Sequence, residues 1–123
     1  MKIADFGVAL ALVVLVPLRA SAQDGDAAQG KVLYQRQCAA CHQATTARNS
    51  VGPTMQGVVG RVAGSVAGFN YSPALKGSGI TWSKETLDTY LANPGATVKG
   101  VRMVQRVPNG QDRQNIIAYL STL

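Results

Sequence analysis

Forty consecutive residues in the middle of this chain, 43–82, lack any long periodic pattern of apolar side chains. Seven of the thirteen glycines lie between Gly52 and Gly79. A structureless stretch of this length argues against a compact domain built from the chain alone. It becomes reasonable when the stretch wraps a large bound group, as Ω-type loops pack on their own side chains. The pattern therefore predicts a chain that folds around a ligand.

The size of the chain supports the same expectation. Its 123 residues suffice for one domain. Small, loop-rich domains usually need disulfides, a metal or another bound group for stability. The two cysteines allow at most one disulfide, so we expect a cofactor.

The N-terminal residues have the pattern of a secretory signal peptide. Lys2 precedes thirteen uncharged, mostly apolar residues, 6–18, and Ala20-Ser21-Ala22 supplies a small-residue cleavage pattern. We predict a signal peptide over 1–22, cleavage before Gln23, and export to the periplasm. The alternative is a retained anchor, but the uncharged run is shorter than the ~20 residues of a spanning helix.

The remainder, 23–123, predicts an all-α domain with three helices, because no alternating strand pattern is present. The first begins after Asp26, an N-cap with Gln29 as its capping-box partner. The second begins at Ser83 and ends at Asn93, before Pro94. The third follows Asn109, and its apolar positions are Ile116, Tyr119, Leu120 and Leu123.

The motif Cys38-Ala39-Ala40-Cys41-His42 carries the chemistry. Two thiols at this spacing on a helical turn reach the two vinyl groups of one haem and form thioethers. The histidine that follows is then placed under the iron. A helix ending around His42 would put all three side chains on one side of the chain. The motif predicts one covalent haem c.

Three other kinds of site use paired cysteines. A thioredoxin-like dithiol needs a βαβ context, which this sequence lacks. A zinc site needs four ligands, and the chain has two cysteines and one histidine. A disulfide across two residues would stabilise very little.

An electron carrier needs a second, soft axial ligand, usually a methionine. After residue 22 the chain offers Met55 and Met103. Met55 lies thirteen residues after His42, where close tethering favours packing against one haem face. Met103, far along the chain, is placed to cross to the opposite face, so we expect it to be the ligand. The alternative for either methionine is flexible core filling.

From Asp26 to Leu123 the chain resembles the class I cytochromes c, single-haem electron carriers of mitochondria and bacteria. The matching segments, in family order, are GKVLYQRQCAACH, VGPTMQGVVGR, GFNYSP, GITWSKETLDTYLANP and QDRQNIIAYL. In that family the methionine ligand lies nine residues after the proline that ends the middle helix, which is the spacing from Pro94 to Met103.

The resemblance assigns further residues to the haem site. It implies that the Pro53 carbonyl accepts the His42 N–H, and that Tyr90 lies beside the Met103 sulfur. It implies that Arg61, Tyr71 and Trp82 donate to the inner propionate, since a buried carboxylate needs donors; the alternatives are a solvated Arg61 and a core Trp82. It also places Gly30 and Tyr119 where the first and last helices cross.

The chain departs from the family at two places near Met103. Residues 99–102 replace the family's Pro-Gly-Thr-Lys, and Gln105 replaces an aromatic residue. We therefore expect a looser methionine loop and a more polar haem edge, with ligand exchange to Lys99 at high pH as an alternative.

The predicted function is single-electron transfer by a monomer between respiratory or photosynthetic complexes, or from a dehydrogenase to an oxidase. Residues 23–123 carry ten basic and five acidic residues, which favours acidic protein partners over nucleic acid. Membranes are reached only through partner complexes. Nothing resembles an acid–base pair or a nucleophile triad, so no enzyme is expected. The alternative is a haem enzyme or gas sensor with a labile methionine ligand. A third hypothesis is an electron-relay subunit that belongs to one dehydrogenase.

Overall fold

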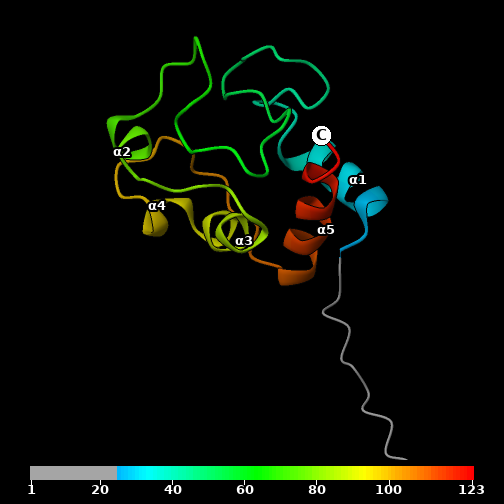
Figure 1. The fold of residues 1–123 in the computed structure, drawn as a ribbon. Helices are drawn as coiled ribbons and strands as arrows, with labels where there is room; N and C mark the ends of the chain where they lie inside the picture. Colours follow the sequence, from blue (N-terminus) through cyan, green and yellow to red (C-terminus); the bar gives the residue numbers. More distant parts are fainter. Residues whose placement is uncertain (1–24) are drawn as a thin grey trace, which may run out of the picture.

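The first and last helices pack against each other and form one side of the molecule. The computed structural model describes residues 25–123, and in it α1 (Ala27–Gln37) and α5 (Gly110–Leu120) lie side by side (Figure 1). Gly30 lies at the crossing, where an added methyl would overlap the Asn115 carbonyl and touch the Tyr119 Cβ. The rings of Tyr34 and Tyr119 meet edge to face, with centroids 5.3 Å apart. The predicted crossing at Gly30 and Tyr119 is confirmed.

The start of α1 is capped across this same interface. The Asp26 carboxylate accepts from the backbone N–H groups of Ala28 and Gln29, as an N-cap does. The Asp26 N–H donates to the Asn115 side chain of α5, over 2.9 Å. The predicted capping-box role of Gln29 is therefore wrong, because a residue from another helix takes that place.

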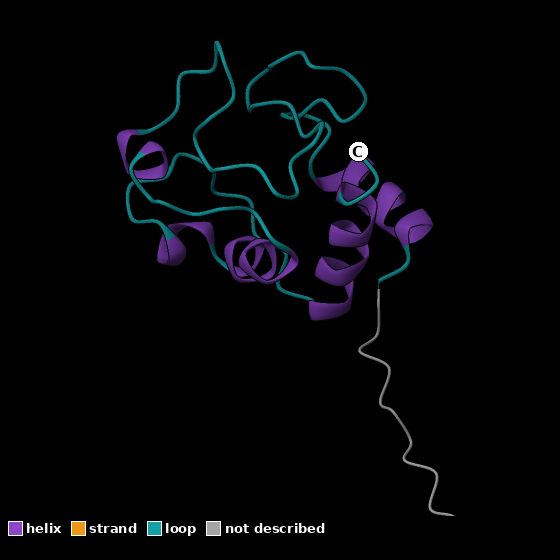
Figure 2. Ribbon diagram, viewed as in Figure 1, coloured by secondary structure: helices purple, strands orange, loops and turns teal. Residues whose placement is uncertain are grey.

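The structure holds five helices in its described part, two more than predicted (Figure 2). The additional helices are single turns, α2 (Pro73–Lys76) and α4 (Pro94–Thr97). Each begins with a proline after a capping side chain, Ser72 or Asn93. Proline suits the first helical position because its fixed φ matches the helix and its missing N–H needs no partner there.

The middle helix, α3 (Lys84–Ala92), has the predicted boundaries. Ser83 and Thr86 form a reciprocal capping box at its start. Asn93 ends α3 and also caps α4. Pro94 thus ends one helix and opens the next, a second role that the sequence prediction missed.

Residues 43–72 form long loops that arch over the helices, as the teal trace shows (Figure 2). No strand is formed between residues 25 and 123; one antiparallel bridge joins Val62 to Thr81. The all-α class is confirmed. The buried core brings the three longer helices together with loop residues; its most buried large side chains are Ile116, Ile117, Val58, Val107 and Pro94.

The predicted signal peptide, 1–22, and the cleavage point before Gln23 lie outside the described residues. Within residues 25–123, no helix has the length and apolar character needed to cross a membrane.

Candidate functional site

The cysteine–histidine motif follows directly on the end of α1. The helix ends at Gln37, with Cys38 as its C-cap, so the expectation of a helix reaching His42 is wrong. The Tyr34 carbonyl accepts from the N–H groups of both Cys38 and Ala39, which closes the helix. The Cys38 carbonyl then accepts from the N–H groups of Cys41 and His42, each over 3.0 Å. These turns keep the two thiols and the imidazole in one tight segment.

No disulfide joins Cys38 to Cys41, and Cys41 is exposed. Burial, and then the nearby Cys41, raise the pKa of the Cys38 thiol to about 11. A reactive dithiol has a lowered pKa, so this environment does not suit a redox-exchange pair. No group of three or more His, Cys, Asp or Glu side chains able to hold a metal is present in residues 25–123. The zinc and dithiol alternatives therefore have no support in the structure.

The imidazole of His42 is held from two sides. Its Nδ1 lies 2.8 Å from the Pro53 carbonyl oxygen. Because a carbonyl only accepts, Nδ1 carries the proton and Nε2 keeps a free lone pair. Gly52 packs directly on the ring, and a methyl at that position would overlap the ring atoms. The Tyr34 hydroxyl also donates to the His42 carbonyl, over 2.9 Å.

Burial lowers the pKa of His42 from its ordinary value. The hydrogen bond to Pro53 acts in the opposite direction, and the charge of Arg61 adds to the lowering. A lowered pKa keeps the imidazole neutral near pH 7, which is the form that binds metal. Two cysteines that form no disulfide, beside a neutral, oriented imidazole, fit the attachment and axial ligation of a haem.

Arg61 holds the loop that supplies Pro53. Its guanidinium donates to the carbonyls of Thr54 (2.9 Å) and Gln56 (3.1 Å). The Met55 N–H donates to the Gln43 carbonyl, next to His42 in the chain. Residues 52–56 are thereby fixed beside the motif.

Arg61 and Trp82 are brought together by backbone pairing. The Trp82 N–H donates to the Arg61 carbonyl, and the Trp82 carbonyl accepts from Gly60. The buried rings of Trp82 and Tyr90 lie 4.8 Å apart.

Tyr71 lies at the far end of the loop region and is also buried. Its hydroxyl oxygen accepts from the Val66 N–H, and its ring meets Phe69 edge to face. The hydroxyl proton is not used in that contact. Tyr71 thus keeps a donor for a ligand carboxylate.

Met55 and Met103 are both half-buried against the core. Their backbones are held by different parts of the molecule. Met55 is tied to Gln43, whereas the segment that carries Met103 is tied to α3 by the Val107 N–H, which donates to the Leu91 carbonyl.

Gly52 is a functional residue that the sequence reasoning missed. Its role rests on contact with His42, ten residues earlier. The only local signal is its position immediately before Pro53 in Val51-Gly52-Pro53. On its own, the dipeptide Gly52-Pro53 indicates only a turn.

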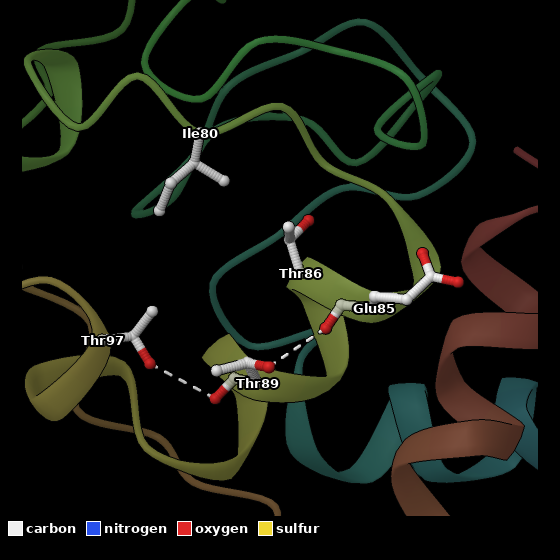
Figure 3. Close-up of a pocket in the computed structure, with 5 residues that line it drawn as sticks. All are labelled: Ile80, Glu85, Thr86, Thr89 and Thr97. Carbon is white, nitrogen blue, oxygen red and sulfur yellow. Dashed lines mark hydrogen bonds between the residues drawn. The ribbon is translucent and has the colours of Figure 1, made fainter.

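A groove of about 300 Å³ lies elsewhere, between α3, α4 and Ile80 (Figure 3). Its other lining residues are Glu85, Thr86, Thr89 and Thr97. The hydroxyls of Thr89 and Thr97 donate to backbone carbonyls, those of Glu85 and Thr89 respectively. The groove includes neither the cysteine–histidine motif nor a methionine, so it is separate from the candidate site.

Comparison with known proteins identifies the family of this chain. The family model described as cytochrome c matches residues 27–123. Cytochrome c2 of Rhodomicrobium vannielii is 50% identical over 100 residues, which cover 80% of this chain and 79% of the relative.

Two solved structures show the same fold. Cytochrome cH from Methylobacterium extorquens is 42% identical, with a TM-score of 0.75, covering 80% of this chain and 100% of the other. Cytochrome c2 from Rhodospirillum centenum is 32% identical, with a TM-score of 0.76, covering 80% and 98%. This chain therefore belongs to the cytochrome c family: it is an electron carrier with one covalent haem c, and Cys38 and Cys41 have the spacing through which that haem is attached.

Proposed function

We propose that this chain is an exported single-electron shuttle in which His42 and Met103 are the axial ligands of the haem iron. The observation that carries the proposal is the fixed imidazole of His42, bonded at Nδ1 to Pro53 and packed on Gly52. When bound, the haem supplies an iron that takes up and releases one electron. In this proposal His42 and Met103 occupy both axial positions of the iron. The site then takes up an electron but binds no substrate.

His42 is suited to the first axial position. The Pro53 carbonyl fixes both the tautomer and the ring orientation, as a second-shell acceptor does for a metal-bound histidine. The lowered pKa keeps Nε2 unprotonated at neutral pH.

Met103 is the better candidate for the second position. The backbone of Met55 is tied to Gln43, beside His42 itself, which supports a packing role on the His42 side. Met103 belongs to a segment anchored on α3 instead. Its position nine residues after Pro94 also matches the family spacing. A thioether favours the ferrous state, which is appropriate for a carrier.

The remaining residues surround the haem in this proposal. The Tyr71 hydroxyl, whose proton is not used in the contact with Val66, and the indole N–H of Trp82 are donors that suit a propionate. Arg61 brings positive charge to the same region while its guanidinium braces the 54–56 loop. Tyr90, in contact with the Trp82 ring, would lie beside the Met103 sulfur.

The partners in this proposal are acidic redox proteins, such as an oxidase, a cytochrome complex, a reaction centre or a dehydrogenase. Lys99, Arg102 and Arg106 flank Met103 and are exposed. Val104 in the same segment is 86% exposed, which gives this surface an apolar centre. The protein acts as a monomer in the periplasm after removal of residues 1–22, and it reaches membranes only through its partner complexes.

The test is expression with the full leader in a host that matures c-type cytochromes. We expect a periplasmic protein with the mass of residues 23–123 plus one haem, and a haem that acid–acetone does not extract. The oxidised form should show the weak thioether-to-iron band, and CO should leave the reduced spectrum unchanged. Rapid CO binding by the wild type would overturn the assignment of Met103. A mass that retains residues 1–22 would overturn the cleavage.

A further inference from the structure

The hydrogen bonds that hold the segment carrying Met103 lie at its two ends. Among the described residues, the backbone groups of 102–106 make no hydrogen bond to other backbone groups. At the start, the Val101 N–H donates to the Val98 carbonyl, and the Arg102 guanidinium donates to the Asn70 carbonyl over 2.9 Å. At the other end, the Val107 N–H donates to the Leu91 carbonyl over 2.8 Å. The position of Met103 therefore depends on these anchors.

Arg113 of α5 completes the second anchor. Its Nη1 donates to the carbonyls of Val107 (3.0 Å) and Pro108 (2.9 Å). Its Nε donates to Asp88 of α3 over 2.8 Å, in the one ion pair found within residues 25–123. The Gln114 amide donates to the same carboxylate. One guanidinium thus joins the end of the Met103 segment to two helices.

The geometry requires an arginine. A guanidinium is a rigid planar fork that serves a carboxylate and two carbonyls at once, whereas a lysine ammonium is a point charge on a flexible stem. The Arg113 side chain is only 16% exposed, so these bonds are shielded from water more than those of an ordinary surface pair. Val107, whose carbonyl accepts one of these hydrogen bonds, is 1% exposed.

We propose that Arg113, held by Asp88, is a positioning residue that fixes the end of the Met103 segment and thereby keeps the thioether on the haem iron. This inference rests on the proposed ligation by Met103. Loosening the anchor increases the fraction of molecules in which Met103 has left the iron. An external ligand then binds more tightly, because its apparent affinity scales with the fraction of open molecules.

The test is imidazole binding to the ferric holoprotein, followed by absorbance. We expect Arg113→Met to bind imidazole about tenfold more tightly than wild type, which corresponds to ~1.4 kcal/mol. The thioether-to-iron band should weaken and the reduction potential should fall. Arg113→Lys should not restore wild-type behaviour. Asp88→Asn, which keeps the shape of the side chain, should give a smaller change in the same direction.

The matched control is Asp26→Ala, which removes the N-cap of α1; the hydrogen bonds of Asp26 go to Ala28, Gln29 and Asn115 and not to the Met103 segment. It should lower the stability but leave imidazole affinity and potential unchanged. If the Arg113 and Asp88 variants behave like this control, Arg113 is only structural and the inference is wrong. If the wild type itself lacks the thioether-to-iron band, the ligation by Met103 is wrong instead.

Discussion

At the scale of single residues, Gly52 and Pro53 act on the same imidazole through different properties. Pro53 offers a carbonyl to Nδ1, and its missing N–H costs nothing in that role. Gly52 has no side chain, which leaves room for the His42 ring; a methyl at this position would overlap the ring atoms. Two adjacent residues thus set the orientation of His42 before any cofactor chemistry is considered.

Met103→Ala should lower the reduction potential, because it removes the proposed soft ligand, and a thioether prefers the ferrous state. Each 59 mV of decrease corresponds to ~1.4 kcal/mol of lost preference for a one-electron couple. The reduced variant should also bind CO. Potentiometric titration and CO difference spectra measure both effects.

Met55→Ala is the matched control for the loss of a methionine. We expect it to keep the potential and the CO-resistant spectrum, at a cost in stability near or below the low end of ~2–5 kcal/mol, because Met55 is only half-buried. If Met55→Ala opened the iron and Met103→Ala did not, the two assignments would be reversed.

The Tyr90 hydroxyl should make the free energy of unfolding depend on pH in the alkaline range. Burial raises its pKa from 10.0 to about 12. Between these values the unfolded chain has lost the proton and the folded protein has kept it, so the free energy of unfolding falls as the pH rises, by at most ~1.4 kcal/mol per pH unit. Tyr90→Phe should lack this contribution. Denaturant unfolding of both proteins across this window measures the difference, and parallel pH profiles would contradict the prediction.

At the scale of helices, caps and crossings decide where each element begins and what it packs on. The three longer helices all start at a side-chain cap, Asp26, Ser83 or Asn109. The crossing of α1 and α5 depends on Gly30, where the α5 backbone approaches too closely for any side chain. Local capping therefore sets the boundaries, and one glycine permits the interface.

Gly30→Ala should destabilise the protein although alanine is the better helix former. Intrinsic propensity alone favours alanine by ~0.5–1 kcal/mol. The added methyl instead overlaps the Asn115 carbonyl, so we expect a net loss of ~1–3 kcal/mol, as for other overpacked sites. Thermal or denaturant unfolding measures this loss.

Gly95→Ala provides the comparison inside another helix. A methyl at Gly95 in α4 meets nothing closer than the Asn93 side chain, at 3.9 Å. This variant should be as stable as the wild type or slightly more so. If the two substitutions changed the stability equally, the close approach of α1 and α5 would not be the reason for glycine at position 30.

At the scale of the whole molecule, three longer helices lie beneath a long loop region in the described part of the chain (Figure 1). The loops of residues 43–72 have little regular structure, and Arg61 and the buried Thr54 hold them through backbone carbonyls. A molecule arranged in this way needs a central group for its loops to pack on, which is consistent with the covalent haem c of its family.

Electron transfer to an acidic partner protein should slow as salt is raised. The Debye length falls from ~10 Å at 0.1 M to ~3 Å at 1 M, which screens the exposed charges around Met103. Stopped-flow rates across this range measure the effect. A flat response would show that these charges only confer solubility.

Charge variants locate the surface responsible. Lys99→Gln and Arg106→Gln should slow the reaction at low salt, because both residues flank Met103. Lys84→Gln is the control, since Lys84 is exposed at the start of α3, near Gly25 and Gln114. If Lys84→Gln slowed the reaction equally, net charge rather than this surface would govern docking.

The sequence alone determined the features that depend on neighbouring residues or on spacing along the chain. The cysteine–histidine motif indicated a covalent haem because its chemistry needs only five consecutive residues. The caps at Asp26, Ser83 and Asn109 indicated three helices for the same reason. The one-turn helices α2 and α4 were missed, although Ser72-Pro73 and Asn93-Pro94 carry the local signal for a helix start.

Only the tertiary structure decided the contacts between distant segments. Asn115 replaces Gln29 as the partner of the Asp26 N–H because α5 lies across the start of α1. Arg113 reaches Asp88 and the end of the Met103 segment because α3 and α5 meet there. Such pairings carry no local pattern, since they depend on which helix faces pack together, and packing is a property of the whole fold.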